Sequence, residues 1–301
     1  FNLTVTGTTG SGQATLSEPH LAVGADGTVF GISTVSTPRG IGTVATQPMQ
    51  LATSTDHGKT WSFSPVSPAV GAASEPVITW IPQGGAQGTL VVAYQYKASA
   101  SLGNSDIFVQ RSTDGGKTWS PAMRLNDDPN NGSEHALPSI DAAPNGRIDV
   151  VWYDFRRNLG FAEDVYYAYS TTDGASWAHN VRVNDRPINL SLGISANSDV
   201  RQPPGVASSN QAAVVGWADP RLANATDETQ DDYSSTVQFA PFPASGNQVL
   251  PYVAAIFGGL AAAGILLIVI LWMRGRGREG EGSPVRPEEA GVTAEGLAPE
   301  A

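Results

Sequence analysis

Two segments of the sequence repeat one pattern of aromatic, acidic and basic residues that is suited to anion binding. They read Trp152-Tyr153-Asp154-Phe155-Arg156 and Trp217-Ala218-Asp219-Pro220-Arg221. Because a guanidinium group forms paired hydrogen bonds with a carboxylate, Arg156 and Arg221 are candidates for binding an acidic ligand, as is Arg39 in another polar segment. Alternatively, each aspartate pairs with the arginine two residues after it and braces its own loop. Repetition favours this structural alternative, since a single binding site needs asymmetry.

Metal and redox chemistry have little support in the sequence. The chain contains no Cys, and its four histidines lie far apart at positions 20, 57, 135 and 179. A disulfide framework and a Cys-ligated zinc or iron–sulfur site are therefore excluded. The run Asn126–Glu134 offers enough oxygen ligands for Ca²⁺ but lacks the EF-hand spacing. A solvated turn is the favoured interpretation of this run, and no cofactor or metal site is predicted.

The composition indicates an acidic, turn-rich protein. Of its 301 residues, 33 are Gly, 21 are Pro and only 15% are charged, whereas a typical soluble domain has about 25% charged residues. The formal net charge of −11 argues against a nucleic-acid partner, because binding phosphates requires clustered Lys and Arg. We therefore expect an all-β fold of short strands joined by many turns.

Three copies of an eight-residue box recur at a constant interval, with their tryptophans 58 residues apart both times. The residues that define the boxes are Ser54, Asp56, Gly58 and Trp61, then Ser112, Asp114, Gly116 and Trp119, then Ser170, Gly174 and Trp177. The third box has Thr172 in place of the aspartate. The Ser and Asp side chains of a box are suited to capping backbone N–H groups in a hairpin turn, where Gly accepts a positive φ. The Trp anchors the turn to the sheet.

Apolar strands recur with the same period. A dipeptide ending in Pro, followed by a turn and an apolar strand, occurs at Glu18-Pro19, Glu75-Pro76, Leu137-Pro138 and Pro203-Pro204. Short strands with regular turn signals and a long repeat predict a β-propeller. The two glutamates either mark the start of the innermost strands or line the central channel.

The box resembles the Asp-box, also called the bacterial neuraminidase repeat, of sialidase-like β-propellers, over about residues 1–240. This resemblance implies blades of four antiparallel strands, with each box between the third and fourth strands. The third strands are then expected at Met49–Thr53, Ile107–Arg111, Val165–Tyr169 and Tyr233–Phe239. Sialidases of this family have six blades, and about four repeats are visible here. Either the N-terminal strand completes the last blade, or further blades precede this sequence, which is the favoured alternative.

The resemblance also implies a ligand and a ligand-binding face. Family sialidases bind the sialic acid carboxylate with three arginines and use a Tyr/Glu pair and an Asp in catalysis. Asp154 and Tyr153 are the catalytic candidates by proximity, while the family's Phe/Tyr-Arg-Ile-Pro motif is absent. The loops expected on the binding face are 33–47, 66–75, 96–105, 126–136, 154–163, 184–202 and 219–231. We expect a propeller that engages glycans or glycoproteins; the alternatives are an active exo-sialidase and a protein–protein interaction module.

A membrane anchor is predicted near the C-terminus. Residues 251–273 contain no charge and are long enough to cross a bilayer as a helix. The basic residues that follow predict a cytoplasmic tail at 274–301, disordered by composition, with the propeller outside and residues 241–250 as the linker. Ala254, Gly258 and Ala262 form a small-residue row compatible with helix dimerisation. Sequons at Asn2, Asn131, Asn189 and Asn224 fit an extracellular domain.

Overall fold

The computed structural model describes residues 4–9, 12–17, 19–34, 49–66, 72–97, 105–129, 132–157, 162–192, 202–223 and 230–239. The chain divides into two units, Phe1–Ala254 and Ala255–Ala301. The predicted linker, transmembrane helix, dimerisation row and tail all lie outside the described residues, as does Arg39. Within the ranges given above, no helix is long and apolar enough to cross a membrane.

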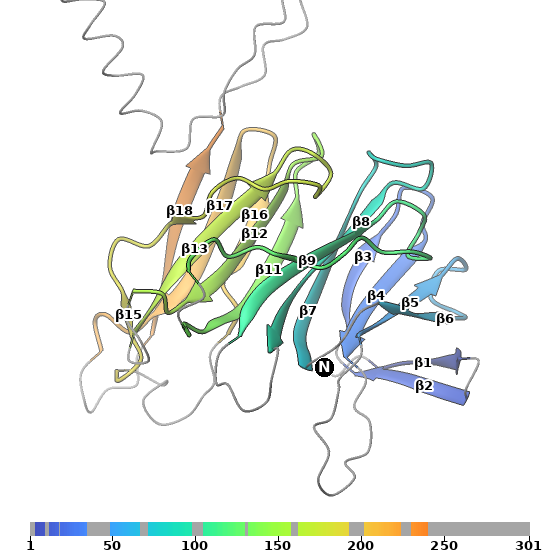
Figure 1. Ribbon diagram of the computed structural model, residues 1–301, viewed down its shortest axis with the longest axis horizontal. Coiled ribbons are helices and arrows are strands. Elements are labelled where there is room, and N and C mark those ends of the chain that lie inside the picture. Colours follow the sequence, from blue (N-terminus) through green and yellow to red (C-terminus); the bar gives the residue numbers. More distant parts are fainter. Residues whose placement is uncertain are drawn as a thin grey trace, which may run out of the picture. The chain divides into compact units, whose positions relative to one another are not determined.

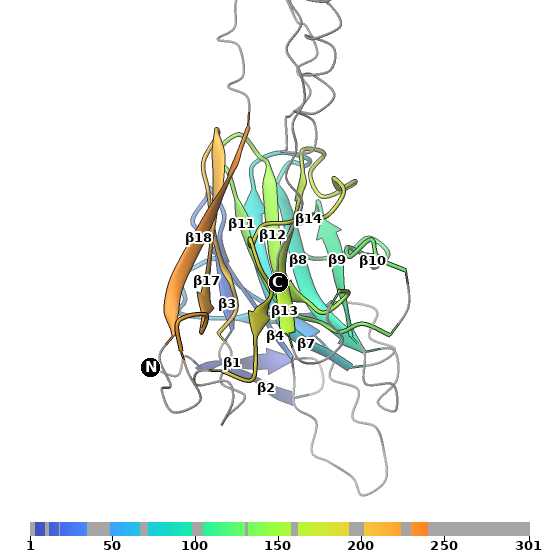
Figure 2. The ribbon, with the colours of Figure 1, turned by 90° about the vertical axis from the view of Figure 1, so that its left-hand side faces the viewer.

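The described strands form four sheets, which we call blades 1 to 4 (Figures 1 and 2). Blade 1 contains β3 (His20–Val23), β4 (Val29–Thr34), β5 (Met49–Ser54) and β6 (Ser62–Val66). Blade 2 contains β7 (Ala72–Ile81), β8 (Thr89–Lys97), β9 (Asp106–Ser112) and β10 (Met123–Arg124). Blade 3 contains β11 (His135–Ala142), β12 (Ile148–Asp154), β13 (Ala162–Ser170) and β14 (Val181–Arg182), with β15 (Ile188–Asn189) also paired to β13. Blade 4 contains β16 (Gly205–Ser208), β17 (Ala212–Asp219) and β18 (Asp231–Gln238).

The hydrophobic core lies between the blades. One buried cluster joins blades 1 and 2 and includes Leu51 and Val92. A second joins blades 2 and 3, and the third, around Tyr167 and Trp217, joins blades 3 and 4. Each cluster is built from alternate residues of neighbouring strands, because successive side chains of a strand point to opposite faces of its sheet. The antiparallel sheets pack through their faces, which is the arrangement of propeller blades.

The four predicted third strands are confirmed, as β5, β9, β13 and β18. The innermost strands of blades 2 and 3 differ from the prediction because they begin before the Pro dipeptides. β7 starts at Ala72 and β11 at His135, and each has a break in register at its dipeptide. Glu75 and Leu137 have positive φ values of 49° and 54° at these bulges. Glu75 therefore lies inside a strand and does not mark its beginning.

The N-terminal strand does not complete the last blade. β1 (Thr4–Thr9) pairs with β2 (Gly12–Ser17) in an antiparallel hairpin, and it pairs with β6 of blade 1 in parallel. The order of this sheet is β2-β1-β6-β5-β4-β3. The alternative in which residues 1–6 close a ring with blade 4 is therefore wrong for the described structure: the hairpin uses the outer edge of blade 1 instead.

The boxes form the turns between the third and fourth strands. The Ser54 hydroxyl donates to Asp56 Oδ1 over 2.8 Å, and this hydroxyl oxygen accepts the Gly58 N–H, also over 2.8 Å. Asp56 Oδ1 also accepts the N–H groups of Lys59 and Thr60. The second box repeats these bonds from Ser112 and Asp114. In the third box, Thr172 Oγ1 accepts the Ser176 N–H over 2.9 Å, so a hydroxyl replaces the missing carboxylate.

All connections from a second to a third strand, and from a fourth strand to the next blade, leave from one side of the sheets. We call this side the loop face. The box turns and the turns between the first and second strands lie at the opposite ends of the strands. Every residue of the repeated Trp-x-Asp-x-Arg pattern falls at the loop face, because the pattern covers the last residues of β12 and β17 and those just after them.

Candidate functional site

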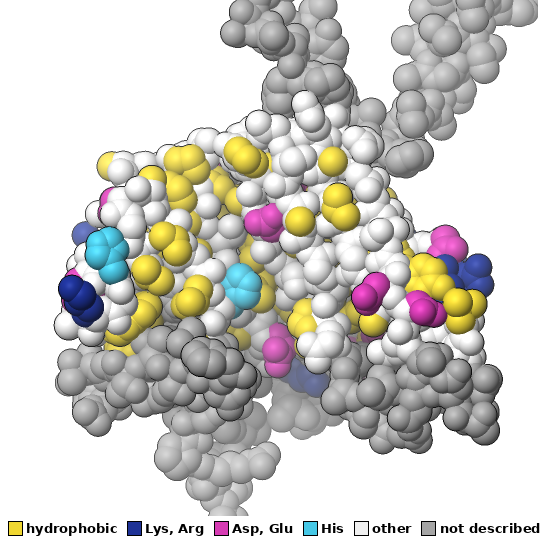
Figure 3. All heavy atoms as spheres, turned by 180° about the vertical axis from the view of Figure 1, so that it is seen from behind, with side chains coloured by type: hydrophobic (Ala, Val, Ile, Leu, Met, Phe, Trp, Pro, Cys, Tyr) yellow, Lys and Arg dark blue, Asp and Glu magenta, His cyan; other side chains and the backbone are white. Residues whose placement is uncertain are grey.

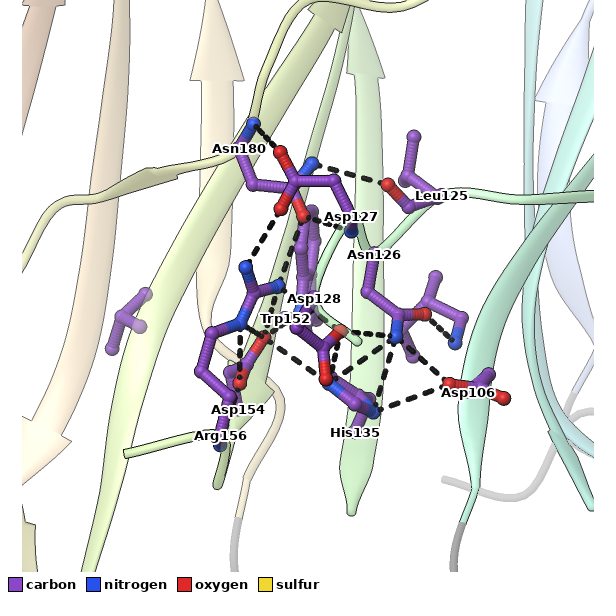
Figure 4. Close-up of polar contacts among 12 residues, drawn as sticks. Asp106, Leu125, Asn126, Asp127, Asp128, His135, Trp152, Asp154, Arg156 and Asn180 are labelled. Atoms are coloured by element: carbon purple, nitrogen blue, oxygen red, sulfur yellow. Dashed lines mark hydrogen bonds and ion pairs between the residues drawn. The ribbon is translucent and has the colours of Figure 1, made fainter. Parts of the chain in front are cut away.

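Arg156 lies in a polar cluster at the loop face, between blades 2 and 3 (Figure 4). Its Nε donates to both oxygens of Asp154 over 3.0 Å, and its Nη1 donates to Asp127 Oδ1 over 2.7 Å. Its Nη2 donates to Asn180 Oδ1 over 2.9 Å. The guanidinium carbon lies 4.1 Å from the centre of the Tyr166 ring. All three guanidinium nitrogens of Arg156 are thus engaged by the protein itself.

Asp127 belongs to blade 2 and Arg156 to blade 3, so their ion pair joins two blades. Partial burial opposes ionisation of Asp127, but hydrogen bonds from the Asn180 N–H and from Arg156 outweigh it and lower the pKa of this carboxyl group. Burial also opposes the charge on Arg156, and Asp154 outweighs it, so the pKa of Arg156 is raised. Each partner therefore stabilises the charged form of the other.

The same arrangement occurs at the loop face between blades 3 and 4. Arg221 donates to Asp219 of its own blade over 2.6 Å from Nη2, and to Asp185 of the preceding blade over 3.2 Å from Nη1. Its guanidinium carbon lies 3.8 Å from the centre of the Tyr233 ring. The hydrogen bond from Arg221 lowers the pKa of Asp185. We call each set of one arginine, the aspartate of its own blade and the aspartate of the preceding blade a clasp.

The clasps correspond to the structural alternative for the repeated pattern. Each arginine pairs with the aspartate two residues before it, and the side chains of Arg156 and Arg221 are only 13% and 10% exposed. The second aspartate was not predicted. Its sequence signal is an Asn-Asp dipeptide after each fourth strand, whose Asp stands eight residues after the Trp of the box, at Asp127 and Asp185.

The clasp between blades 2 and 3 has additional buried groups. His135 is completely buried, with Nε2 3.1 Å from Asp128 Oδ1 and 3.5 Å from Asp154 Oδ2. Its Nδ1 lies 2.9 Å from the Ser105 carbonyl oxygen. Asn126 donates both amide protons to carboxylates, one to Asp128 and one to Asp106, each over 2.8 Å. This network links the start of β11 to the end of blade 2.

The two catalytic candidates lie inside the protein. Asp154 is 0% exposed and accepts hydrogen bonds from Arg156 and from the Trp152 indole N–H, the latter over 2.9 Å. Tyr153 is 2% exposed and packs in the apolar cluster between blades 3 and 4. The structure therefore brings Asp154 and Arg156 together as an ion pair and points Tyr153 into the core, which leaves no acid–nucleophile pair at the surface from these residues.

The run considered for Ca²⁺ is engaged by protein donors. Asn126 Oδ1 accepts the Ile107 N–H over 2.9 Å, and Asp127 and Asp128 are paired as described above. Across the described ranges no group of three or more His, Asp or Glu side chains has an arrangement that could hold a metal ion. The tip of the run, residues 130–131, lies outside these ranges.

Solved structures with a similar fold include β-propeller glycoside hydrolases. The Penicillium chrysogenum alpha-L-arabinanase, complexed with arabinobiose, is 19% identical over 79% of this chain and 66% of its own, with a TM-score of 0.51. The GH93 alpha-L-arabinofuranosidase of Fusarium graminearum, also complexed with arabinobiose, is 16% identical over 82% and 76%, with a TM-score of 0.50. A Hadza microbial sialidase is 15% identical over 71% and 45%, with a TM-score of 0.47.

The likenesses to the arabinanase and the arabinofuranosidase define the class of fold, an all-β propeller. No family model and no curated protein sequence matches the chain. The chain spans 66% of the length of the arabinanase and 45% of that of the sialidase. Activity and ligand are therefore matters for proposal, because one fold hosts many functions.

Proposed function

We propose that this protein engages glycans or glycoconjugates through its loop face, displayed outside a membrane by the segment 251–273. The observation that carries the proposal is the fold, which is shared at a TM-score of 0.50 or above with propellers solved in complex with arabinobiose. Binding residues concentrate on loops that a rigid scaffold positions. Here the loops between blades leave from one face, and the clasps and interblade cores hold the blades together beneath it.

Binding, without hydrolysis, is the function that the described residues support best. Asp154 is sealed by Arg156 and Trp152, and Tyr153 is a core residue. Glycoside hydrolysis requires a positioned acid and a nucleophile or base flanking the scissile bond. An active exo-sialidase would have to take these groups from other residues, and its carboxylate-binding arginines from outside the two clasps.

A glycan array tests the proposal. The full-length chain, purified in detergent micelles and labelled at its N-terminus, is applied to immobilised neutral and sialylated glycans. We expect saturable binding to a restricted set of glycans that free glycan in solution abolishes. An array that stays blank at micromolar protein, beside a folded sample by circular dichroism, would count against glycan engagement and favour a protein partner.

Turnover is tested separately with fluorogenic glycosides of sialic acid and of arabinose. We expect no release of the fluorophore above the rate without protein. Release that disappears in an Asp154→Asn protein with the wild-type melting temperature would contradict the assignment of Asp154 to a structural ion pair and would support the hydrolase alternative.

A further inference from the structure

The junction between blades 1 and 2 lacks the charged residues that form a clasp elsewhere. The positions of its two aspartates and its arginine are occupied by Ala69, Tyr96 and Ala98. Strand pairing confirms the alignment of the blades, because Tyr94 pairs with Phe108 across β8 and β9. The corresponding pairs are Trp152 with Tyr166 in blade 3 and Trp217 with Tyr233 in blade 4.

Tyr96 packs on the aromatic ring that a clasp arginine covers in the other blades. In blades 3 and 4 the third-strand tyrosine lies beneath the guanidinium group. In blade 2 the equivalent ring, Phe108, contacts Tyr96, with centroids 5.2 Å apart and an interplanar angle of 69°. Phe108 also stacks with Tyr94 at 6.2 Å. Tyr96 and Phe108 both remain partly exposed, so blade 2 presents aromatic surface at the loop face where blades 3 and 4 present ion pairs.

A hydrogen-bonding side chain lies on the neighbouring strand, β7. Lys97 follows Tyr96 at the end of β8, so its side chain points to the opposite face of the sheet from Tyr96. Glu75 is exposed at the bulge of β7, two residues after Ala73, which pairs with Tyr96. The equivalent bulge in blade 3 has Leu137 at a similar positive φ. The bulge therefore does not require a carboxylate. Of blades 2 and 3, only blade 2 has a carboxylate at this position, on Glu75.

We propose that Tyr96 and Phe108 form a sugar-stacking surface at the loop face, and that the glycan bound there is uncharged. This inference rests on the proposed function and names the ligand class of its site. A pyranose or furanose ring presents an apolar C–H face that packs against an aromatic ring, while its hydroxyl groups hydrogen-bond to a few polar side chains. Glu75 is suited to that second role.

The engagement of the arginines supports an uncharged ligand. A sialic acid carboxylate is best bound by a free guanidinium group, but Arg156 and Arg221 already bind two aspartates each. At the junction of blades 1 and 2, Glu75 is exposed and opposes an anionic ligand by its own charge. The proposed site therefore differs in its class of ligand from the sites of the sialidases that the box sequence of this protein resembles.

Saturation-transfer NMR on the full-length chain in micelles tests this site, with arabinobiose, lactose and 3′-sialyllactose as probes. We expect transfer to the ring C–H protons of a neutral probe, no gain in affinity from lactose to 3′-sialyllactose, and about tenfold weaker binding in Tyr96→Leu. Tyr96→Phe, which keeps the ring, should bind as wild type does. Phe63→Leu, at a half-buried aromatic residue of β6, is the matched control for loss of a ring.

The outcomes separate this inference from the proposed function. Binding of 3′-sialyllactose alone would overturn the uncharged ligand and leave glycan engagement standing. Equal affinity in the wild type and in a folded Tyr96→Leu would overturn the stacking surface, again without touching glycan engagement. If none of the three probes binds and the array is also blank, the proposed function fails, and the inference fails with it. Equal thermal midpoints for the Tyr96 variants and the Phe63 control exclude misfolding as the cause of a loss.

Discussion

At the scale of single residues, Arg156 donates to Asp154, Asp127 and Asn180, and Arg221 repeats the two aspartate contacts one blade later. Removing one partner of a buried ion pair leaves an uncompensated charge, and the penalty falls on stability. An arginine that served only a ligand would instead be replaceable without destabilising the fold. Stability therefore distinguishes the two roles of these side chains.

We predict that Arg156→Met lowers the free energy of unfolding by about 3 kcal/mol, because it leaves the fully buried Asp154 without the guanidinium group that it binds. Arg157→Met is the matched control. The side chain of Arg157 is 51% exposed, and its Nη1 lies 3.9 Å from Asp164 Oδ2. Loss of this side chain should therefore change the free energy of unfolding by less than about 1 kcal/mol. Urea unfolding of the full-length chain, followed by tryptophan fluorescence, measures both. An Arg156→Met protein with the wild-type midpoint would contradict the clasp.

The box carboxylates give a prediction for acid. Hydrogen bonds from the side chain and backbone of Thr60 lower the pKa of Asp56 to about 2, and Thr118 does the same for Asp114. Because the folded pKa lies below the unfolded value of 3.8, their contribution to stability is present above pH 3.8 and is lost as the pH falls through 2. The melting temperature should therefore decline between pH 4 and pH 2.

We expect Asp56→Asn with Asp114→Asn to flatten this decline. Thr172→Ala provides the internal comparison, because it removes the analogous hydrogen bond of the third box without removing a titratable group. It should lower the melting temperature equally at every pH. A decline of unchanged slope in the double variant would assign the acid sensitivity to other carboxylates.

At the scale of elements, each box turn of blades 2 and 3 packs against the preceding blade. A Cβ added to Gly116 would lie 2.1 Å from Leu51 Cδ2 of blade 1, whereas one added to Gly58 would meet only Trp61 at 3.7 Å. Both glycines have nearly the same positive φ, 86° and 85°. Substitutions at these two glycines therefore separate the effect of backbone strain, which both positions share, from the effect of packing between blades.

We predict that Gly58→Ala destabilises the protein by about 1–2 kcal/mol through strain alone. Gly116→Ala should cost a further 1 to 3 kcal/mol or so, because Leu51 is completely buried and has little room to move. Urea unfolding of the two variants decides the point. Equal effects would show that the box turn of blade 2 does not press against blade 1.

His20 links the innermost strands β3 and β7, since its Nδ1 accepts the Ile78 N–H over 3.2 Å. Burial lowers its pKa below 6.5. The unfolded chain then binds more protons below that pH, so stability should fall as the pH drops from 6.5 through the folded pKa. The melting temperature measured against pH tests this dependence. His20→Asn keeps a hydrogen-bond acceptor that does not titrate, so it should remove the decline in melting temperature.

At the scale of the whole molecule, the repeat period predicted the four third strands and the placement of the box turns, because both depend on local sequence. The bulges at Glu75 and Leu137 and the hairpin on the edge of blade 1 were not predicted, since they depend on pairing between strands. The second aspartate of each clasp was missed for a similar reason: Asp127 and Arg156 are 29 residues apart, and each looks like an ordinary loop charge. The second aspartate becomes recognisable in the sequence only when the blades are compared position by position.

The space-filling view from behind shows apolar side chains beside acidic ones on this side of the molecule (Figure 3). The surface chemistry of this side therefore does not single out a binding site. The repeat distinguishes one junction, because two junctions between blades are closed by ion pairs, whereas in the part of the chain that the structure describes the third has Tyr96 in place of an aspartate. Loss of symmetry among blades is the feature that a single binding site requires.

The central claim, glycan engagement at the loop face, is tested most directly by hydrogen exchange of the full-length chain with and without a glycan that binds on the array. We predict added protection in peptides that contain the loop-face ends of β7, β8 and β9. No change is expected in the box turns, residues 54–61, 112–119 and 170–177. Protection confined to the box turns would place the ligand on the opposite face and contradict the account.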